Sequence, residues 1–548
     1  MAFSLPAKIS WPTTWWLRRS RLASRDKARP DKDDVDEPLL PTVGGHGSSP
    51  LPNLSDERVK LTEEDNTRIC RKTDLNILPI LVWVYFLQIL DKTTLGYAAV
   101  FNLERDTGLT GRQYSLIGSV APFAQLLWQP FSSWLIVKVP HKILVSALVL
   151  GWGVSQATMA ACNNFTGLMI TRFFLGLFEA GCLPVFSVIT SHWYRRQEQP
   201  MRVAAWYSTN GISNVVAAGL AYGLGHIKSD ILRPWQIIFL FVGLVTIATA
   251  PLVYWRLPND ILSAPFFDKH EKAQAVERLR ANQTGTGSRD FRLEQVAELL
   301  VELKTWLFIS MTLLLNIGTQ VTSVFGPLIL AGFGFDKYAT TLLNMPFGIL
   351  QFIAIMFGSW AALRFRFKSL VLASMMVPVT IGVALLYFLP RTGDHASLMA
   401  SFYLLSFMFA GNPLIVSWIV GNTAGTTKKS VIMSLYNGGS AGGNIIGPLL
   451  FKTKDAPSYQ PGLRAVLAIF VALLVVIFLQ LVNLVGLNKL QQKRRVAHGK
   501  KAIIHDHSMD DHYVAFDEET EDVEGAELGQ AAFADLTDRQ NDEFTYIY

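Results

Sequence analysis

The sequence predicts an all-α membrane protein with twelve transmembrane helices in two halves of six, and with both termini in the cytoplasm. Three observations carry this prediction. The chain of 548 residues is 50% hydrophobic and only 17% charged, whereas about a quarter of the residues of an average soluble protein are charged. Apolar runs of about 20 residues, long enough to cross a bilayer, recur along the chain. Stretches of the first half also reappear in the second.

Twelve apolar runs define the two halves. In the first half, residues 74–255, they lie at 77–100, 115–136, 143–162, 167–190, 203–225 and 235–255. In the second half, residues 306–487, they lie at 306–331, 339–362, 369–389, 398–420, 430–451 and 463–487. The charged stretch between the halves, residues 256–305, is expected to be a cytoplasmic central loop.

Both ends of the chain are polar. Residues 1–73 are rich in proline, serine and charged side chains, which is typical of a disordered tail. Residues 488–548 form an acidic tail that is expected to be solvated. Basic residues such as Arg195, Arg364 and Lys428 are more frequent in the loops on the side of both tails than in the opposite loops. By the positive-inside rule, that side is the cytoplasm.

Internal similarity supports the division into halves. Residues 132–145, SSWLIVKVPHKILV, align with residues 358–371, GSWAALRFRFKSLV. A nearly equal shift pairs two Asn-Gly-x-Ser segments, at residues 210–213 and 437–440. Two parallel halves of six helices are the arrangement of the major facilitator fold, in which the substrate binds between the halves near the middle of the membrane.

Ionisable side chains within the predicted spans mark the candidate transport route, because each costs a few kcal/mol in a bilayer unless it is paired or solvated. The first span carries Gln88, Asp91 and Lys92, and the fourth carries Arg172 and Glu179. We expect a bridge between Asp91 and Arg172, with Lys92 or Arg172 compensating the charge of an anion. Glu179, which has no basic partner on its own helix face, or Asp91 would carry a proton. The alternatives are that Lys92 snorkels outward beside a structural Asp91, and that Glu179 is a hydrogen-bonded structural residue.

Uncharged polar residues lie at matching places in the later spans. Amides can bind a carboxylate or a ureide without the cost of a buried charge, but they also join membrane helices to one another. We expect the joining role for any single residue and a share in the site for the set. The candidates are Asn210, Asn316, Gln320, Asn344, Tyr436, Asn437 and Asn444.

Several segments resemble the fungal allantoate permease family, in the anion:cation symporter branch of the major facilitator superfamily. They are DKTTLGYAAV in the first span, RFFLGLFEAG in the fourth, TAGTTKKSVIMSLYNGGSAGGNIIGPLLF into the eleventh and LTDRQNDEF near the C-terminus. The resemblance implies proton-coupled movement of small organic anions, among them allantoate, ureidosuccinate and vitamin carboxylates, across the plasma membrane. It also implies that the charged residues of spans one and four correspond to those of the family; they are Asp91, Lys92, Arg172 and Glu179.

One loop departs from the superfamily pattern. Between spans two and three that pattern has an acid, in Asp-Arg-x-Gly-Arg/Lys, whereas this chain reads KVPHKI, with Lys138 and Lys142 but no acid. The acidic partner of a gating latch at this loop therefore has to come from elsewhere or be absent.

The sequence thus predicts a proton-coupled importer of a small organic anion that acts as a monomer in the lipid bilayer by alternating access. No cofactor besides the proton gradient, no metal and no nucleic acid is expected. An exporter of a secondary metabolite or its precursor and a non-transporting nutrient sensor are the alternatives. An enzyme is disfavoured, because the sequence holds no metal motif, nucleophile elbow or nucleotide loop. Of the sequons at Asn53, Asn164 and Asn282, only Asn164 faces outside in this topology, where it can carry a glycan.

Overall fold

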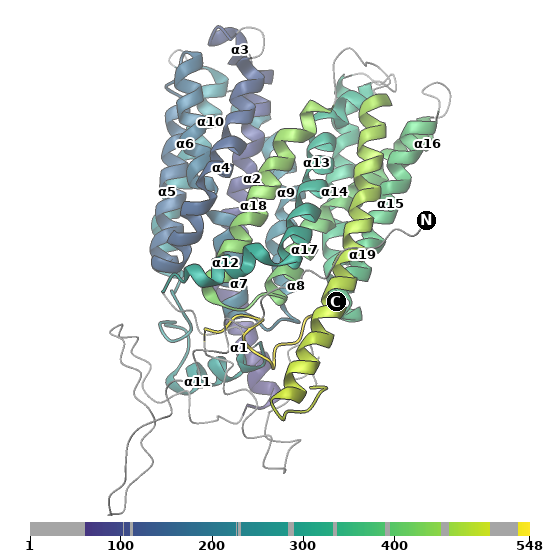
Figure 1. The fold of residues 1–548 in the computed structure, drawn as a ribbon. Coiled ribbons are helices and arrows are strands. Elements are labelled where there is room, and N and C mark those ends of the chain that lie inside the picture. Colours follow the sequence, from purple (N-terminus) through teal and green to yellow (C-terminus); the bar gives the residue numbers. More distant parts are fainter. Residues whose placement is uncertain are drawn as a thin grey trace, which may run out of the picture. The chain divides into compact units, whose positions relative to one another are not determined.

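The computed structural model describes residues 61–101, 103–109, 113–225, 227, 232–282, 290–331, 337–389, 395–450, 460–504 and 535–548. This part of the chain consists of helices joined by loops (Figure 1). The helices up to the end of the first half are α1 (Glu63–Asn76), α2 (Leu78–Val100), α3 (Leu103–Asp106), α4 (Gln113–Lys138), α5 (His141–Met159), α6 (Phe165–Glu179), α7 (Cys182–Trp193), α8 (Gln199–Tyr207), α9 (Thr209–Gly225) and α10 (Pro234–Arg256).

The central loop and the second half continue the helical series. The central loop holds α11 (Lys269–Glu277), the 3-10 helix η1 (Arg280–Asn282) and α12 (Leu293–Val301). The second half holds α13 (Leu303–Ala331), α14 (Lys337–Phe365), α15 (Lys368–Phe388), α16 (His395–Leu404), the 3-10 helix η2 (Leu405–Ala410), α17 (Gly411–Gly421), α18 (Thr426–Leu449) and α19 (Gln460–Ala497).

The helices agree with the predicted apolar runs. Each run lies on one helix or on consecutive helices, such as α6 and α7 for the run at 167–190. Among the described residues, eight helices are long and apolar enough to cross a membrane, or nine if the bent pair α12 and α13 is one span. The all-helical fold is therefore confirmed, whereas the number of twelve spans and their orientation in the membrane stay predictions.

Small residues explain how closely the helices pack. Along the chain, α4 packs on α6 within the first half, α13 packs on α18 within the second, and α4 packs on α18 between the halves. A Cβ atom on Gly176 of α6 would collide with the backbone of Ala121 in α4. A Cβ atom on Gly211 of α9 would lie 2.6 Å from the carbonyl oxygen of Gly348 in α14, so the two halves also touch there. Glycine at such crossings lets membrane helices approach each other.

The structure corrects the expected extent of both tails. Residues 63–76 overlap the segment expected to be disordered, but they form α1 because Thr62 and Asp65 cap its first turn reciprocally and because Lys72 binds Glu271 of α11 at 2.7 Å. Residues 535–548 were expected to be solvated, but all of them except Gln540 are buried or half-buried. They lie at the end of the bundle where α1, α11 and α12 also lie, which we call the tail end (Figure 1). Residues 1–60 are outside the described residues.

Candidate functional site

Glu179 is the centre of a polar cluster inside the first half. Its side chain is buried, and its Oε1 atom accepts a hydrogen bond from Nε2 of Gln88 at 2.9 Å. The same oxygen forms an ion pair with Nζ of Lys92 at 2.8 Å. Gln88 and Lys92 are one helical turn apart, so one face of α2 supplies both partners. The structure therefore brings three predicted residues together, and the basic partner that Glu179 lacks on its own helix comes from α2.

The expected bridge between Asp91 and Arg172 is not formed. Asp91 is fully buried, and neither carboxylate oxygen has a hydrogen-bond partner in the described part of the chain. The expected bridge overlooked a difference in depth that the predicted run at 167–190 already implied, because Arg172 lies near the start of α6 and its span continues through α7 to Trp193. At about 1.5 Å per residue counted from Trp193, Arg172 lies roughly 30 Å and Glu179 roughly 20 Å from the tail end of the bundle, and Asp91, counted from Leu78 at the start of α2, lies roughly 20 Å from it. Lys92 therefore meets the acid at its own depth, which is Glu179.

A second set of polar contacts joins the two halves. The hydroxyl groups of Tyr207 in α8 and Tyr436 in α18 are 3.0 Å apart, and Tyr436 donates to Oδ1 of Asn412 at 2.9 Å. Nδ2 of Asn316 in α13 donates to the same oxygen at 3.2 Å. Sequence reasoning missed Tyr207 and Asn412, although each is a polar residue in an apolar run, which is the signal that identified the others.

Hydrogen bonds also join the halves at the depth of Glu179 and nearer the tail end. Asn437 in α18 donates from Nδ2 to the carbonyl oxygen of Ala180 at 2.7 Å. About two turns nearer the tail end, the hydroxyl of Ser430 in the same helix donates to the carbonyl oxygen of Ser133 in α4 at 2.8 Å. A solute bound near Glu179 would therefore have to separate these contacts to pass the tail end.

The other predicted residues have different surroundings. Nδ2 of Asn210 donates to the hydroxyl of Tyr85 at 3.3 Å, and Asn444 is half-buried in α18. The side chains of Gln320 and Asn344 lie outside the described residues. Asn164 is exposed at the N-terminus of α6, where its Oδ1 atom accepts a hydrogen bond from the backbone N–H of Gly167 at 2.8 Å. Its glycosylation stays a prediction.

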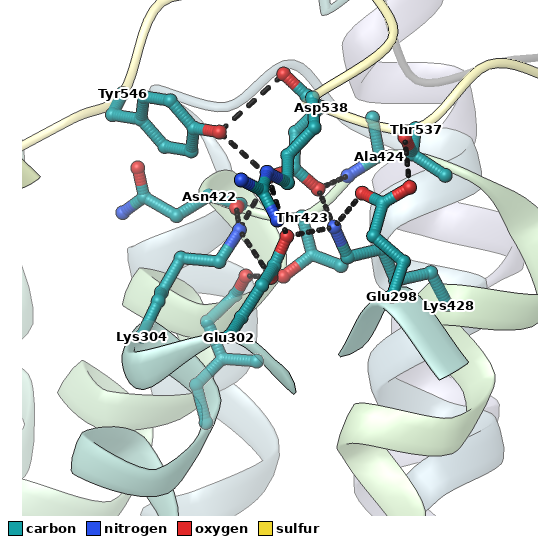
Figure 2. Close-up of polar contacts among 12 residues, drawn as sticks. Glu298, Glu302, Lys304, Asn422, Thr423, Ala424, Lys428, Thr537, Asp538 and Tyr546 are labelled. Atoms are coloured by element: carbon teal, nitrogen blue, oxygen red, sulfur yellow. Dashed lines mark hydrogen bonds and ion pairs between the residues drawn. The ribbon is translucent and has the colours of Figure 1, made fainter. Parts of the chain in front are cut away.

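A charge cluster that the sequence did not predict lies at the tail end (Figure 2). Nζ of Lys428 in α18 lies 2.7 Å from Glu298, 2.7 Å from Glu302 and 2.8 Å from Asp538. Three carboxylates this close could hold a metal ion, but here the Lys428 ammonium contacts all three of them.

Asp538 is the acid of this cluster that comes from the C-terminal segment. Its Oδ2 atom lies 2.5 Å from Nζ of Lys304 in α13 and accepts a hydrogen bond from the hydroxyl of Tyr546 at 2.8 Å. Although burial opposes ionisation, Lys304 and Lys428 together hold the pKa of Asp538 well below its ordinary value. The carboxyl group is therefore ionised at neutral pH, and it connects the first turns of α13 and α18.

Comparison with known proteins identifies the family. Residues 81–448 match the model of the Major Facilitator Superfamily. The chain is 33% identical to the thiamine pathway transporter THI73 of Saccharomyces cerevisiae, over 89% of this chain and 87% of that protein. It is 27% identical to the allantoate permease of the same yeast, over 89% of this chain and 88% of that protein.

A solved structure agrees at the level of the fold. The fold is similar to that of the proton:xylose symporter XylE, with a TM-score of 0.60 and 12% identity over 76% of this chain and 95% of the other. The chain thus belongs to the major facilitator superfamily and, within it, to the allantoate permease family of fungal transporters, so that it is a multi-pass membrane transporter and not an enzyme.

Proposed function

We propose that this transporter is a proton-coupled importer that carries a small organic anion, such as a carboxylate, a ureide or a vitamin, across the plasma membrane by alternating access. The observation that carries the proposal is the presence, at one depth of the first half, of a half-exposed cation and a buried acid. The cation is Lys92, whose side chain is 47% exposed. The acid is Asp91, which has no hydrogen-bond partner in the described part of the chain.

Lys92 is the group that would bind the anionic part of the substrate. Its ammonium is paired with Glu179, yet half of the side chain is accessible, so a second carboxylate can approach and compete for it. Charge-assisted hydrogen bonds of this kind are about twice as strong as neutral ones. The amides of Asn210 and Asn316 would bind the uncharged polar part of the substrate without adding a buried charge.

Asp91 is the group that would carry the proton. An ionised carboxylate in a bilayer is costly unless it is paired, and neither oxygen of Asp91 has a hydrogen-bond partner among the described residues. Protonation removes this cost. Glu179 is less suited to the role, because it is already paired with Lys92 and accepts a hydrogen bond from Gln88.

Proton and anion would act together on the two conformations. An anion on Lys92 displaces the ammonium from Glu179, while a proton on Asp91 removes one negative charge at the same depth. The loaded site therefore keeps its charge balance in the middle of the membrane, which lets the halves separate near the tail end. A ligand shifts such an equilibrium only by its different affinity for the two states, and both groups supply that difference.

The names of two relatives define the substrates to be tried first. An allantoate permease is 27% identical, which supports a ureide carboxylate, and a thiamine pathway transporter is 33% identical. The panel therefore contains labelled allantoate, ureidosuccinate, vitamin carboxylates and thiamine. Uptake is measured in cells that lack their own permeases, with and without a protonophore.

The expected result is accumulation of one compound that collapses when the protonophore is added. Accumulation that is unchanged by the protonophore would contradict proton coupling but would still support import. Efflux from preloaded cells without uptake would show an exporter. No movement of any compound, with the protein present at the cell surface, would favour a nutrient sensor.

A further inference from the structure

The last fourteen residues of the chain lie in a site built for them at the tail end. We define residues 535–548 as the latch segment. Asp538 lies between Lys304 and Lys428 (Figure 2), and Asp535 accepts a hydrogen bond from the backbone N–H of Thr426 at 2.7 Å. The segment thus supplies the acids that face the N-terminus of α18, where backbone N–H groups have no partner within the helix.

The other end of the latch segment is held by the same half of the protein. The backbone of Ile547 accepts hydrogen bonds from Trp418 and Asn422 at 2.9 Å each, and its N–H donates to Asn422 at 2.7 Å. The carbonyl oxygen of Tyr548 accepts from the backbone N–H of Lys368 at 2.6 Å. The segment is therefore fastened to α13, α15, α17 and α18, all of which belong to the second half.

Arg196 of the first half also contacts the latch segment. Arg196 lies in the turn between α7 and α8, and its guanidinium lies 4.2 Å from the centre of the Phe544 ring. Its Nη1 atom donates to the carbonyl oxygen of Thr545 at 3.2 Å. A cation over an aromatic face and a hydrogen bond to a neutral carbonyl are each weaker than the buried ion pairs of Asp538. Among the contacts of the described residues, the second half therefore holds the segment more firmly than Arg196 of the first half does.

We infer that residues 535–548 form a conformational latch that stays fixed to the second half and keeps the tail end closed by gripping Arg196 of the first half. The loop at residues 138–142 carries no acid, and Asp535 and Asp538 supply the acidic groups at the start of α18 instead. Opening the tail end breaks the contact between Arg196 and Phe544 while the pairs of Asp538 persist. The inference rests on the proposed function only for alternating access, and not for the substrate or the proton.

The test measures opening directly, in the full chain and without a substrate. Ser430, which is buried where α18 meets α4, is replaced by cysteine in a protein whose Cys70, Cys162 and Cys182 are replaced. The rate at which a small permeant maleimide labels Ser430→Cys in native membranes reports how often the tail end opens. This background is then combined with changes in the latch segment.

Two variants loosen the latch at different points. Phe544→Leu keeps the apolar volume but removes the aromatic face under Arg196, and we expect labelling to become about three- to tenfold faster. Asp538→Asn weakens the hold of the second half, and we expect at least the same acceleration. Asp542→Asn is the matched control, since this acid of the same segment pairs with the exposed side chain of His498 and with Lys500; its labelling rate should equal that of the background.

Each labelling result either supports the latch or overturns it. Unchanged labelling in both loosened variants would overturn the inference, and so would equal acceleration in the Asp542→Asn control. If Asp538→Asn does not fold, Phe544→Leu decides alone, because it leaves the charge cluster intact. A protein that transports nothing on the panel can still show the labelling difference, so failure of the proposed function and failure of the latch are distinguishable.

Discussion

The buried acids of the two charge clusters of this transporter differ in their contacts. At the tail end, Asp538 contacts both Lys304 and Lys428. In the middle of the first half, Asp91 is just as buried, yet neither of its oxygens has a hydrogen-bond partner among the described residues. A carboxylate held by two lysines stays ionised and stabilises one conformation, whereas an unpaired buried carboxylate is stable only when it is protonated. The first arrangement suits a structural latch, and the second suits a site that gains and loses a proton.

The largest effect is expected for Asp91→Asn. The amide resembles the protonated acid but cannot release a proton, so concentrative uptake should fall to background. Exchange of labelled for unlabelled substrate across the membrane should continue, because that process needs no net proton movement. Both are measured in the same vesicles, with Asp542→Asn as the control. Concentrative uptake at the normal rate that still collapses with a protonophore would exclude Asp91 as the proton site.

The same substitution at the other cluster should act on stability. Asp538→Asn leaves Lys304 and Lys428 without their shared acid, and removing one member of a buried pair costs about 3 kcal/mol or more. Thermal unfolding of the purified protein should therefore begin at a lower temperature. Asp91→Asn is the matched variant and should leave the melting temperature unchanged or raise it, because the acid it removes accepts no hydrogen bond from the described residues. Equal destabilisation of the two variants would contradict the view that Asp538 stabilises the fold through its ion pairs and Asp91 does not.

Apolar runs and isolated ionisable residues predicted the all-helical fold and the residues that gather around Glu179. The partner of each charge could not be predicted, because it depends on depth and on helix rotation. Arg172 lies near the start of α6, farther from the tail end than Asp91, and Glu179 is the acid that lies at the depth of Lys92. The latch segment was expected to be solvated because it belongs to a C-terminal tail that is rich in acidic residues. Its apolar residues Phe544 and Ile547 were the available signal, but lysines more than a hundred positions away provide its site.

A smaller effect is expected for the pair of Lys92 and Glu179. Lys92→Met leaves the Glu179 carboxylate buried without its cation, and since Lys92 is half exposed we expect a loss of about 1–2 kcal/mol. The double variant Lys92→Met with Glu179→Gln removes both charges and should recover the melting temperature. Uptake should stay absent in both, since the cation that would bind the anion is gone. Uptake restored by the double variant would show that Lys92 serves structure only.

The smallest expected effect is the response of the latch to pH. A carboxyl group whose pKa is lowered by folding contributes stability above its unfolded value of about 3.9, and this stability is lost only as the pH falls through the lower folded value. Since the pKa of Asp538 is lowered by Lys304 and Lys428 against the opposing effect of burial, its pairs persist from about pH 5 to about pH 8. The labelling rate of Ser430→Cys, divided by the rate for unfolded protein at the same pH, should stay constant over this range. Uptake should rise as the pH outside falls over the same range, because the proton is a co-substrate at Asp91. A labelling rate that followed the pH dependence of uptake would mean that the latch itself carries the titrating group. In that case the proton site in the bundle and the permanently charged latch at its end would not be separate.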